Sequence, residues 1–192
     1  MKCLKTLGLA VIAAIAMVTL AASSASASTL EIGGVTQNKS VTITASEVPD
    51  SSMLLGTTSG GFANTCLESH LHFDTDDYTG FDTEGPIYAL ALASCTNEKV
   101  VVDKACRLSI AWTSGTNGTV TSSGAELTVP SPIGALNCKT GSGTDIGTLT
   151  GKASGSAVLD IKAVLNCGFL VPSAKWECEY FITSPQSLGV EP

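Results

Sequence analysis

The stretch CKTGSGTDIGTLTGKASGSAVLDIKAVLNCGFLVPSAKWEC, residues 138–178, decides the fold of this chain. It contains a hairpin pattern that turns at Lys152-Ala153 and is flanked by Cys138, Cys167 and Cys178. Subtracting 72 from these three cysteine numbers gives three more cysteines, at the same spacings of 29 and 11 residues: Cys66, Cys95 and Cys106. Equal spacings indicate two similar halves, at about residues 41–112 and 113–184, with two convergent disulfide hairpins as the alternative.

The rest of the chain consists of short strand patterns separated by Gly, Ser, Thr, Asn and Pro. Val41–Ala45 alternates with a period of two before Pro49 interrupts it, and Ile87–Ser94 is apolar on both faces, which predicts a central strand. Between these two segments we expect another strand, with Leu67, Leu71 and Phe73 on one face. No amphipathic helix follows residue 27. The sequence therefore predicts an all-β protein, an antiparallel sandwich or alternatively a closed barrel.

Residues 1–27 have the pattern of a signal peptide. Lys2 and Lys5 precede the uncharged apolar run Leu9–Ala22, and Ala25-Ser26-Ala27 offers a cleavage site before Ser28. The run is shorter than the roughly 20 residues that a membrane span needs. We expect residues 28–192 to form a single secreted domain, which either is free outside the cell or associates with the envelope, and we expect no membrane span in the mature chain.

Charge and length restrict the class of partner. Removal of 27 of the 192 residues leaves 165, enough for one domain with a sizeable core. It also removes two of the ten basic residues, and the remaining eight against 17 acidic residues give a net charge of −9. This balance argues against nucleic acid and anionic membrane surfaces as partners.

Six cysteines remain after Cys3 is removed, and in an oxidising compartment they favour disulfides. A zinc site is the alternative, but no two of them form a C-x₂₋₄-C pair. If a pseudo-twofold axis relates the two halves, three disulfide connectivities of the six cysteines remain. Turn chemistry favours one of these, because Gly80-Phe81 and Lys152-Ala153 suit hairpin centres better than Val100-Val101-Val102 does. The favoured pairs are Cys66–Cys95, Cys138–Cys167 and Cys106–Cys178.

Five segments resemble a group of small exported actinobacterial proteins that has no assigned activity. They are Asn64-Thr65-Cys66, Gly118–Val129, Cys138–Gly151, Leu165–Trp176 and Ser184–Val190. The resemblance implies a signal peptide, Thr- and Gly-rich strands, and cysteines at four positions: Cys66, Cys95, Cys138 and Cys167. Cys106 and Cys178 depart from the pattern of the group, and no catalytic residue is implied.

Chemistry-bearing side chains gather in one segment, Glu68–Asp77. On a strand, His70, His72 and Asp74 would project from one side, and two imidazoles with a carboxylate can bind a metal ion. This is the candidate metal site, although charged side chains near a strand end commonly face solvent. A looser carboxylate site for calcium could use Asp74, Asp76, Asp77, Asp82 and Glu84, with a soluble acidic hairpin tip as the alternative.

Enzyme motifs are absent from the sequence: there is no G-x-S-x-G, and Gly141–Gly147 misses the dinucleotide-binding pattern and precedes a strand. The sequence thus favours an exported, non-catalytic β domain that binds an unidentified extracellular or cell-surface ligand or serves as an envelope component. It favours no cofactor other than the candidate metal ion. A metal-dependent binder or enzyme centred on His70 and His72 is the alternative.

Overall fold

The computed structural model describes residues 28–49, 51, 53–57, 62–76, 83–169, 171 and 173–192. The predicted signal peptide and the hairpin centre at Gly80-Phe81 lie outside these ranges. The described residues form strands and no helix, and so contain no helix that could cross a membrane. The strands are β1 Thr29–Ile32, β2 Val35–Thr36, β3 Thr42–Glu47, β4 Met53–Thr57, β5 Ala63–Asp74, β6 Thr83–Cys95, β7 Val101–Lys104, β8 Arg107–Ser114, β9 Asn117–Ser122, β10 Glu126–Val129, β11 Leu136–Lys139, β12 Thr144–Thr150, β13 Val158–Leu165, β14 Ala174–Ser184 and β15 Leu188–Glu191.

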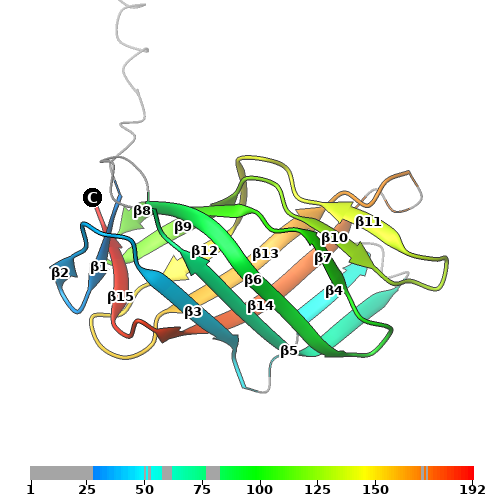
Figure 1. The fold of residues 1–192 in the computed structure, drawn as a ribbon, viewed down its shortest axis with the longest axis horizontal. Coiled ribbons are helices and arrows are strands. Elements are labelled where there is room, and N and C mark those ends of the chain that lie inside the picture. The colour runs from blue at the N-terminus through cyan, green and yellow to red at the C-terminus, as the bar shows by residue number, and fades with distance from the viewer. Residues whose placement is uncertain are drawn as a thin grey trace, which may run out of the picture.

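Eight antiparallel strands close into a barrel (Figure 1). Their order around the wall is β3, β5, β6, β8, β9, β12, β13 and β14, and β14 pairs with β3 to complete the ring. The prediction of an all-β protein is confirmed, and the arrangement is the closed barrel rather than the sandwich. Closure leaves no terminal strand in the ring, so the barrel presents fewer exposed edges than an open sandwich would.

Alternating burial along the strands builds the core inside the barrel. In β13, the longest apolar pattern of the sequence, Leu159, Ile161, Ala163 and Leu165 are buried, and the residues between them are not. In β14, Trp176, Cys178, Tyr180 and Ile182 are buried in the same way. Burying each large apolar side chain contributes about 1.5–3 kcal/mol.

The strands of residues 41–112 and 113–184 follow the same pairing scheme. Each half contributes four successive barrel strands, first β3, β5, β6 and β8, then β9, β12, β13 and β14. Each half also contributes a short strand that pairs once within its own half and once with the other: β4 pairs with β5 and β14, and β10 pairs with β11 and β7. The internal repeat that the cysteine spacing predicts stays a prediction.

One barrel strand is interrupted. β3 and β4 both pair with β5 and β14 and run in the same direction, so they form one line that is interrupted between them, where Pro49 cannot donate to a ladder. On β5 the alternation also shifts opposite this break: Cys66 and Ser69 are buried, whereas Leu67 is 64% exposed. The expectation that Leu67 shares a face with Leu71 and Phe73 is therefore wrong, because the burial alternation of β5 changes phase between Cys66 and Ser69.

Two small sheets complete the molecule (Figure 1). β15, β1 and β2 form a sheet at one end, where Leu30, Leu188 and Val190 are buried. β7, β10 and β11 form another sheet toward the opposite end, beside the wall that contains β6. The barrel is thus capped at one end and extended at the other.

The structure contains two disulfides, Cys66–Cys95 and Cys138–Cys167, and both match the pairs that the sequence favours. The third predicted pair is not formed, because Cys106 and Cys178 are both free, buried thiols. Cys106 immediately precedes β8 and Cys178 lies in β14, and four strand steps separate β8 from β14 in either direction around the barrel. The two thiols therefore belong to opposite walls, which the spacing of the cysteines along the chain does not reveal.

Candidate functional site

The candidate metal ligands lie on the outer face of β5. His70 and His72 are exposed, Asp74 is half-buried, and His70 Nδ1 lies 3.1 Å from Ser46 Oγ. Within the described ranges no group of three His, Cys, Asp or Glu side chains is close enough to hold a metal ion. His70, His72 and Asp74 face the same side, as predicted, but they are not gathered around one point.

The acidic residues proposed for calcium have other partners. Arg107 forms ion pairs with both Asp76 and Glu84, and its Nη2 lies 3.0 Å from Glu84 Oε1. Asp74 is close enough to Tyr88 that its charge raises the pKa of that phenol. Asp77 and Asp82 lie outside the described residues. One cation of the protein therefore occupies the position between two carboxylates that a calcium ion would need.

The barrel wall has an opening between β6 and β7. β6 pairs with β8 over only four residues, Thr83–Pro86, and the Ile87 N–H then donates to the Cys106 carbonyl. Among the residues that the structure describes, β6 beyond Ile87 pairs only with β5, and β7 pairs only with β10. In the second half, the equivalent strands β13 and β14 pair over eight residues without interruption. The two halves thus differ where a full ladder is replaced by two facing strand edges.

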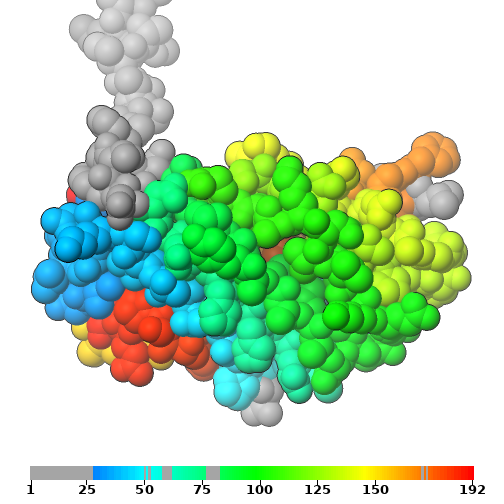
Figure 2. Space-filling view, viewed as in Figure 1, coloured from blue at the N-terminus to red at the C-terminus, as the bar shows by residue number. Residues whose placement is uncertain are grey.

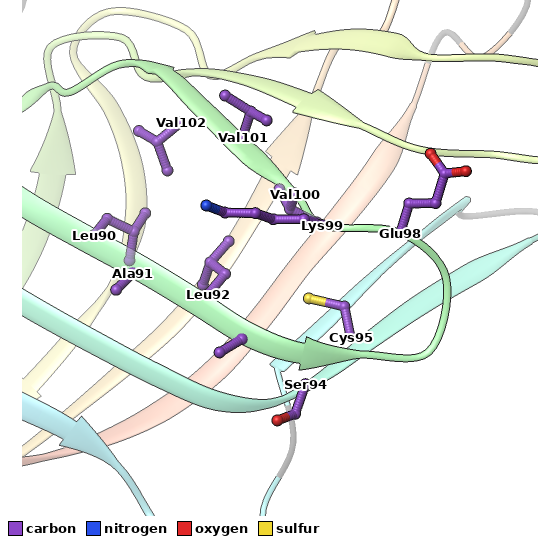
Figure 3. Close-up of a pocket in the computed structure, with 11 residues that line it drawn as sticks. Leu90, Ala91, Leu92, Ser94, Cys95, Glu98, Lys99, Val100, Val101 and Val102 are labelled. Carbon is purple, nitrogen blue, oxygen red and sulfur yellow. The ribbon is translucent and has the colours of Figure 1, made fainter.

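A cavity of about 880 Å³ occupies this opening. Its apolar lining comes from Leu90 and Leu92 of β6 and from Val100 and Val102 on the opposite side, and the Lys99 side chain lies across it (Figure 3). The surface is hollowed between the green segments that contain β6 and β7, and orange-red atoms of the C-terminal strands are visible behind it (Figure 2). The opening therefore leads from the surface toward the barrel interior.

A second cavity, of about 550 Å³, continues from the opening. Both cavities are lined by Glu98, Lys99 and Val101, and the second extends to the loop that contains Pro130 and Pro132. Together they form a groove that leads from the barrel wall over β7 and β10. This shape suits an elongated ligand better than a compact one.

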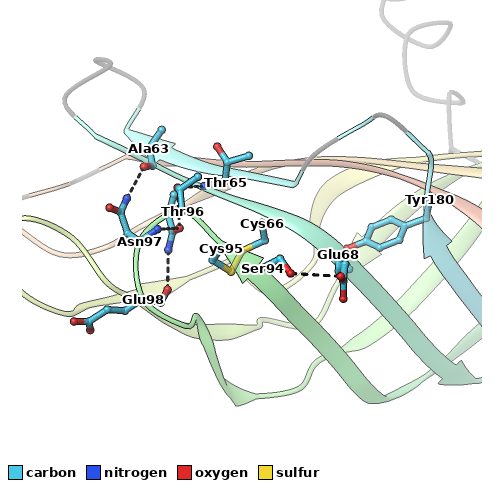
Figure 4. Close-up of a disulfide and its surroundings, with 12 residues drawn as sticks. Ala63, Thr65, Cys66, Glu68, Ser94, Cys95, Thr96, Asn97, Glu98 and Tyr180 are labelled. Atoms are coloured by element: carbon cyan, nitrogen blue, oxygen red, sulfur yellow. Dashed lines mark hydrogen bonds between the residues drawn. A yellow bond between two sulfur atoms is a disulfide. The ribbon is translucent and has the colours of Figure 1, made fainter.

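The loop between β6 and β7 is tied to β5, which keeps the opening from closing (Figure 4). The buried Asn64 side chain accepts a hydrogen bond from the Asn97 N–H at 3.1 Å and donates to the Glu98 carbonyl at 3.3 Å. Thr96 and Thr65 exchange two further bonds, of 2.8 and 3.0 Å. The Cys66–Cys95 disulfide fixes the end of β6 beside them. β7 therefore begins from a position anchored on β5 and not on the free edge of β6.

A group of polar side chains lies buried behind this wall. Leu92 pairs with Ser69 on β5, and Ser69 Oγ lies 2.7 Å from the hydroxyl of Tyr180, which comes from β14. Tyr180 in turn pairs with Glu47 of β3, and the Cys178 thiol bonds to Tyr180 and Ser69. Figure 4 shows the Tyr180 ring extending from β14 toward β5. The hydrogen bonds span the part of β5 that has no ladder partner opposite the break in β3 and β4.

Burial keeps the thiol and the phenol of this group protonated. Desolvation raises the pKa of Cys178 to about 12 and raises the pKa of Tyr180 well above its usual value. Desolvation also raises the pKa of Glu47, although a backbone bond from Met53 and a bond from Ser51 act in the opposite direction. A protonated thiol and a protonated phenol are neither nucleophiles nor bases near neutral pH. The group can donate and accept hydrogen bonds but is not set up for covalent catalysis.

Two buried polar atoms have no partner within the described part of the chain: Glu47 Oε2 and Trp176 Nε1. Trp176 is only 3% exposed and lies on the same buried face of β14 as Tyr180. An unpaired buried N–H costs about 1–3 kcal/mol. Among the described residues, β14 therefore holds one unpaired donor and β3 one unpaired acceptor.

Sequence reasoning missed the opening. The apolar character of Ile87–Ser94 predicted a central strand, but Tyr88, Ala89, Ala91 and Ala93 are exposed. The alternating alanines of β6 did not reveal this exposure, because alanine is among the residues most often fully buried. Val100-Val101-Val102 was correctly interpreted as strand-forming. No sequence pattern shows, however, that one edge of this strand lacks a partner.

Comparison with protein-family models, curated proteins and solved structures gives no match for this chain.

Proposed function

We propose that this chain is an exported, non-catalytic binding protein whose ligand occupies the opening between β6 and β7. The observation that carries the proposal is the interruption of the wall itself. A ladder that is complete in one half is absent in the other, and a cavity of about 880 Å³ with apolar walls takes its place. Pockets of 300–1,000 Å³ that combine apolar walls with few polar groups are typical of ligand sites.

The chemistry of the lining supports binding rather than turnover. Leu90, Leu92, Val100 and Val102 offer apolar contact, and Lys99 is the cationic side chain that lies across the opening. The thiol and phenol behind Leu92 have raised pKa values and stay protonated. A ligand with an apolar body and an anionic group fits this set of side chains.

Function outside the cell is supported by the two disulfides, which are stable in an oxidising compartment. The signal-peptide pattern of residues 1–27 supports export independently, and the acidic balance of the mature chain supports solubility. Free secretion and association with the envelope both agree with these features.

Titration with anilinonaphthalene sulfonate, an apolar fluorophore with one anionic group, tests the proposal. We expect a saturable rise in fluorescence for the mature protein and at least a tenfold loss of affinity in Leu90→Trp, which adds bulk at the mouth of the cavity. Val164→Trp is the matched control, because Val164 is 59% exposed on β13, the equivalent strand of the closed hairpin. Cooperative thermal unfolding of each variant shows that it is folded.

The same titration can overturn the proposal. Non-saturable binding to the folded wild-type protein, or equal affinities of the wild-type protein and Leu90→Trp, would place the fluorophore elsewhere and leave the opening without a ligand.

A further inference from the structure

We propose that the natural occupant of the opening is an extended peptide, which enters between β6 and β7 as an additional strand. This inference rests on the proposed function and specifies its ligand. Apolar walls alone would accept many small molecules. The two facing strand edges are a more specific feature, because main-chain N–H and C=O groups on both sides are complementary to another main chain.

The edge of β6 presents its hydrogen-bonding groups toward the opening. In a strand, residues whose side chains share one face direct their N–H and C=O groups to the same side. Ile87 is buried and directs its N–H toward Cys106, on the side of β7 and β8. Leu90 and Leu92 also face inward, since the alternation shifts at Tyr88 and Ala89. Their N–H and C=O groups therefore point into the opening.

The second half of the chain shows what those groups would gain. There, β13 pairs with β14 from Val158 to Leu165, and the main-chain groups on that side are satisfied. In the first half, the equivalent main-chain groups of β6, and those on the edge of β7 that faces β6, have no strand partner within the described ranges. A peptide strand would restore the missing ladder and join the barrel wall to the sheet of β7, β10 and β11.

Direction and side chains of the peptide follow from the geometry. β6 and β7 are successive and antiparallel, so an inserted strand is antiparallel to one and parallel to the other. We assign the antiparallel pairing to β6, because its free edge is the longer one and antiparallel ladders are slightly more stable. Alternate side chains would then face Leu92 and Val100 and should be apolar, and an acidic residue would pair with Lys99, whose ammonium has no ion-pair partner in the described structure.

The groove that continues toward Pro130 and Pro132 gives the peptide an exit over β7 and β10. About 3.3 Å of length per residue allows a segment of six to eight residues to lie along β6 from Leu90 past Cys95.

The experiment selects peptides from a displayed library of random eight-residue sequences on the mature, disulfide-bonded protein. Each selected peptide is then synthesised with an N-methyl group at one position at a time, which removes one main-chain donor and leaves the side chain intact. We expect at least a tenfold loss of affinity for central positions and little loss at the ends. Binding should also weaken at least fivefold in Lys99→Glu, an exposed substitution that is compatible with folding, and should persist in Val164→Trp.

Hydrogen exchange supplies the second measurement. The amides of Leu90 and Leu92 should exchange faster than those of Leu159 and Ile161, which lie between two ladders. Bound peptide should slow exchange at Leu90 and Leu92 by at least tenfold and leave Leu159 and Ile161 unchanged.

The outcomes separate this inference from the proposed function. If no peptide is selected, or if N-methylation has no effect and exchange at Leu90 and Leu92 does not change, the peptide inference fails. If anilinonaphthalene sulfonate still binds at the opening in that case, the proposed function stands with a different ligand. If the fluorophore also fails to bind there, both proposals fail.

Discussion

Tyr180 and Ser69 show how single residues hold the barrel together where a ladder is missing. Tyr180 is fully buried in β14 and reaches past the break in β3 and β4 to Ser69 on β5, at 2.7 Å between the two oxygens. A phenol can bury a large apolar ring and still satisfy its hydroxyl. This bond replaces a main-chain contact with a side-chain contact, and it makes the wall beside the opening dependent on two residues.

Tyr180→Phe should lower the free energy of unfolding by about 1–2 kcal/mol, because it leaves the buried Ser69 hydroxyl without its phenol partner. Urea unfolding monitored by circular dichroism measures the change. Tyr88→Phe is the matched control, since Tyr88 is 66% exposed and its hydroxyl contacts Asp74 outside the core. A loss in Tyr88→Phe as large as that in Tyr180→Phe would show that the buried bond is not responsible.

Glu47 should give the protein a pH-dependent stability. Burial raises its pKa above the usual 4.5, so the charged form is disfavoured in the folded state. The contribution of this group to stability is therefore complete below pH 4.5 and is lost as pH rises through the raised pKa. Glu47→Gln cannot titrate, so its melting temperature relative to wild type should rise between about pH 4 and about pH 7. Thermal melts of Glu179→Gln, which changes an exposed carboxylate on β14, should follow the wild type, and an identical pH profile for Glu47→Gln would contradict the prediction.

At the scale of elements, the two disulfides support different strands, although each joins cysteines that are 29 residues apart. Cys66–Cys95 joins β5 to β6 at the end of the opening, where β6 has one ladder only. Cys138–Cys167 lies beside the bridge between Lys139 and Asn166. The first bond therefore holds the end of a partly supported barrel strand, and the second joins β11, the outer strand of the β7, β10 and β11 sheet, to the chain that follows β13.

Replacing Cys66 and Cys95 together with serine should lower the free energy of unfolding by about 3.6 kcal/mol, the chain entropy released when a loop of this length is no longer closed. Denaturant unfolding measures this value. The double variant should also increase hydrogen exchange at Ala93, which pairs with Glu68 of β5, because the end of β6 loses its anchor, whereas replacing Cys138 and Cys167 should not. Equal exchange at Ala93 in both double variants would show that the disulfide does not support the end of β6.

Much of the element pattern could be predicted from the sequence. Alternation identifies the strands, and repeated spacing with turn residues identifies two disulfides. What the sequence could not show are features that depend on neighbours: the phase shift at Leu67, the free edge of β6, and the placement of Cys106 and Cys178 on opposite walls. Each arises from the order of strands around the barrel, and residues on adjacent strands can be far apart in the chain.

At the scale of the whole molecule, residues 41–112 and 113–184 each supply four consecutive strands of the barrel, and neither set forms a closed ring alone. β8 pairs with β9, and β14 pairs with β3, so both seams of the barrel lie between the halves. The opening is the main difference between the two sets of strands. Because the repeated cysteine spacing shows only what the halves share, it could not reveal the candidate site. The candidate metal residues were read correctly as one outward face, but strand spacing could not show whether they converge.

The mature protein should begin at Ser28 and contain two free thiols. Export from a secreting host followed by intact-mass measurement tests the cleavage site. Titration with a thiol reagent should give about two thiols per chain after unfolding without reductant and none in the native protein, because burial raises the pKa of Cys106 and Cys178 and hides both sulfurs. The absence of thiols after unfolding would show a third disulfide and contradict the arrangement of opposite walls.

The seam between β3 and β14 has a consequence for assembly. Thr183 and Thr44, which are joined across it by a hydrogen bond, are 139 residues apart in the chain. Contacts between such distant positions form late and slowly during folding. Until β14 pairs with them, β3, β4 and β13 each have an unpaired edge. A proteolytic cut or a truncation that releases β14 would therefore expose three strand edges to which other chains could add, which favours aggregation.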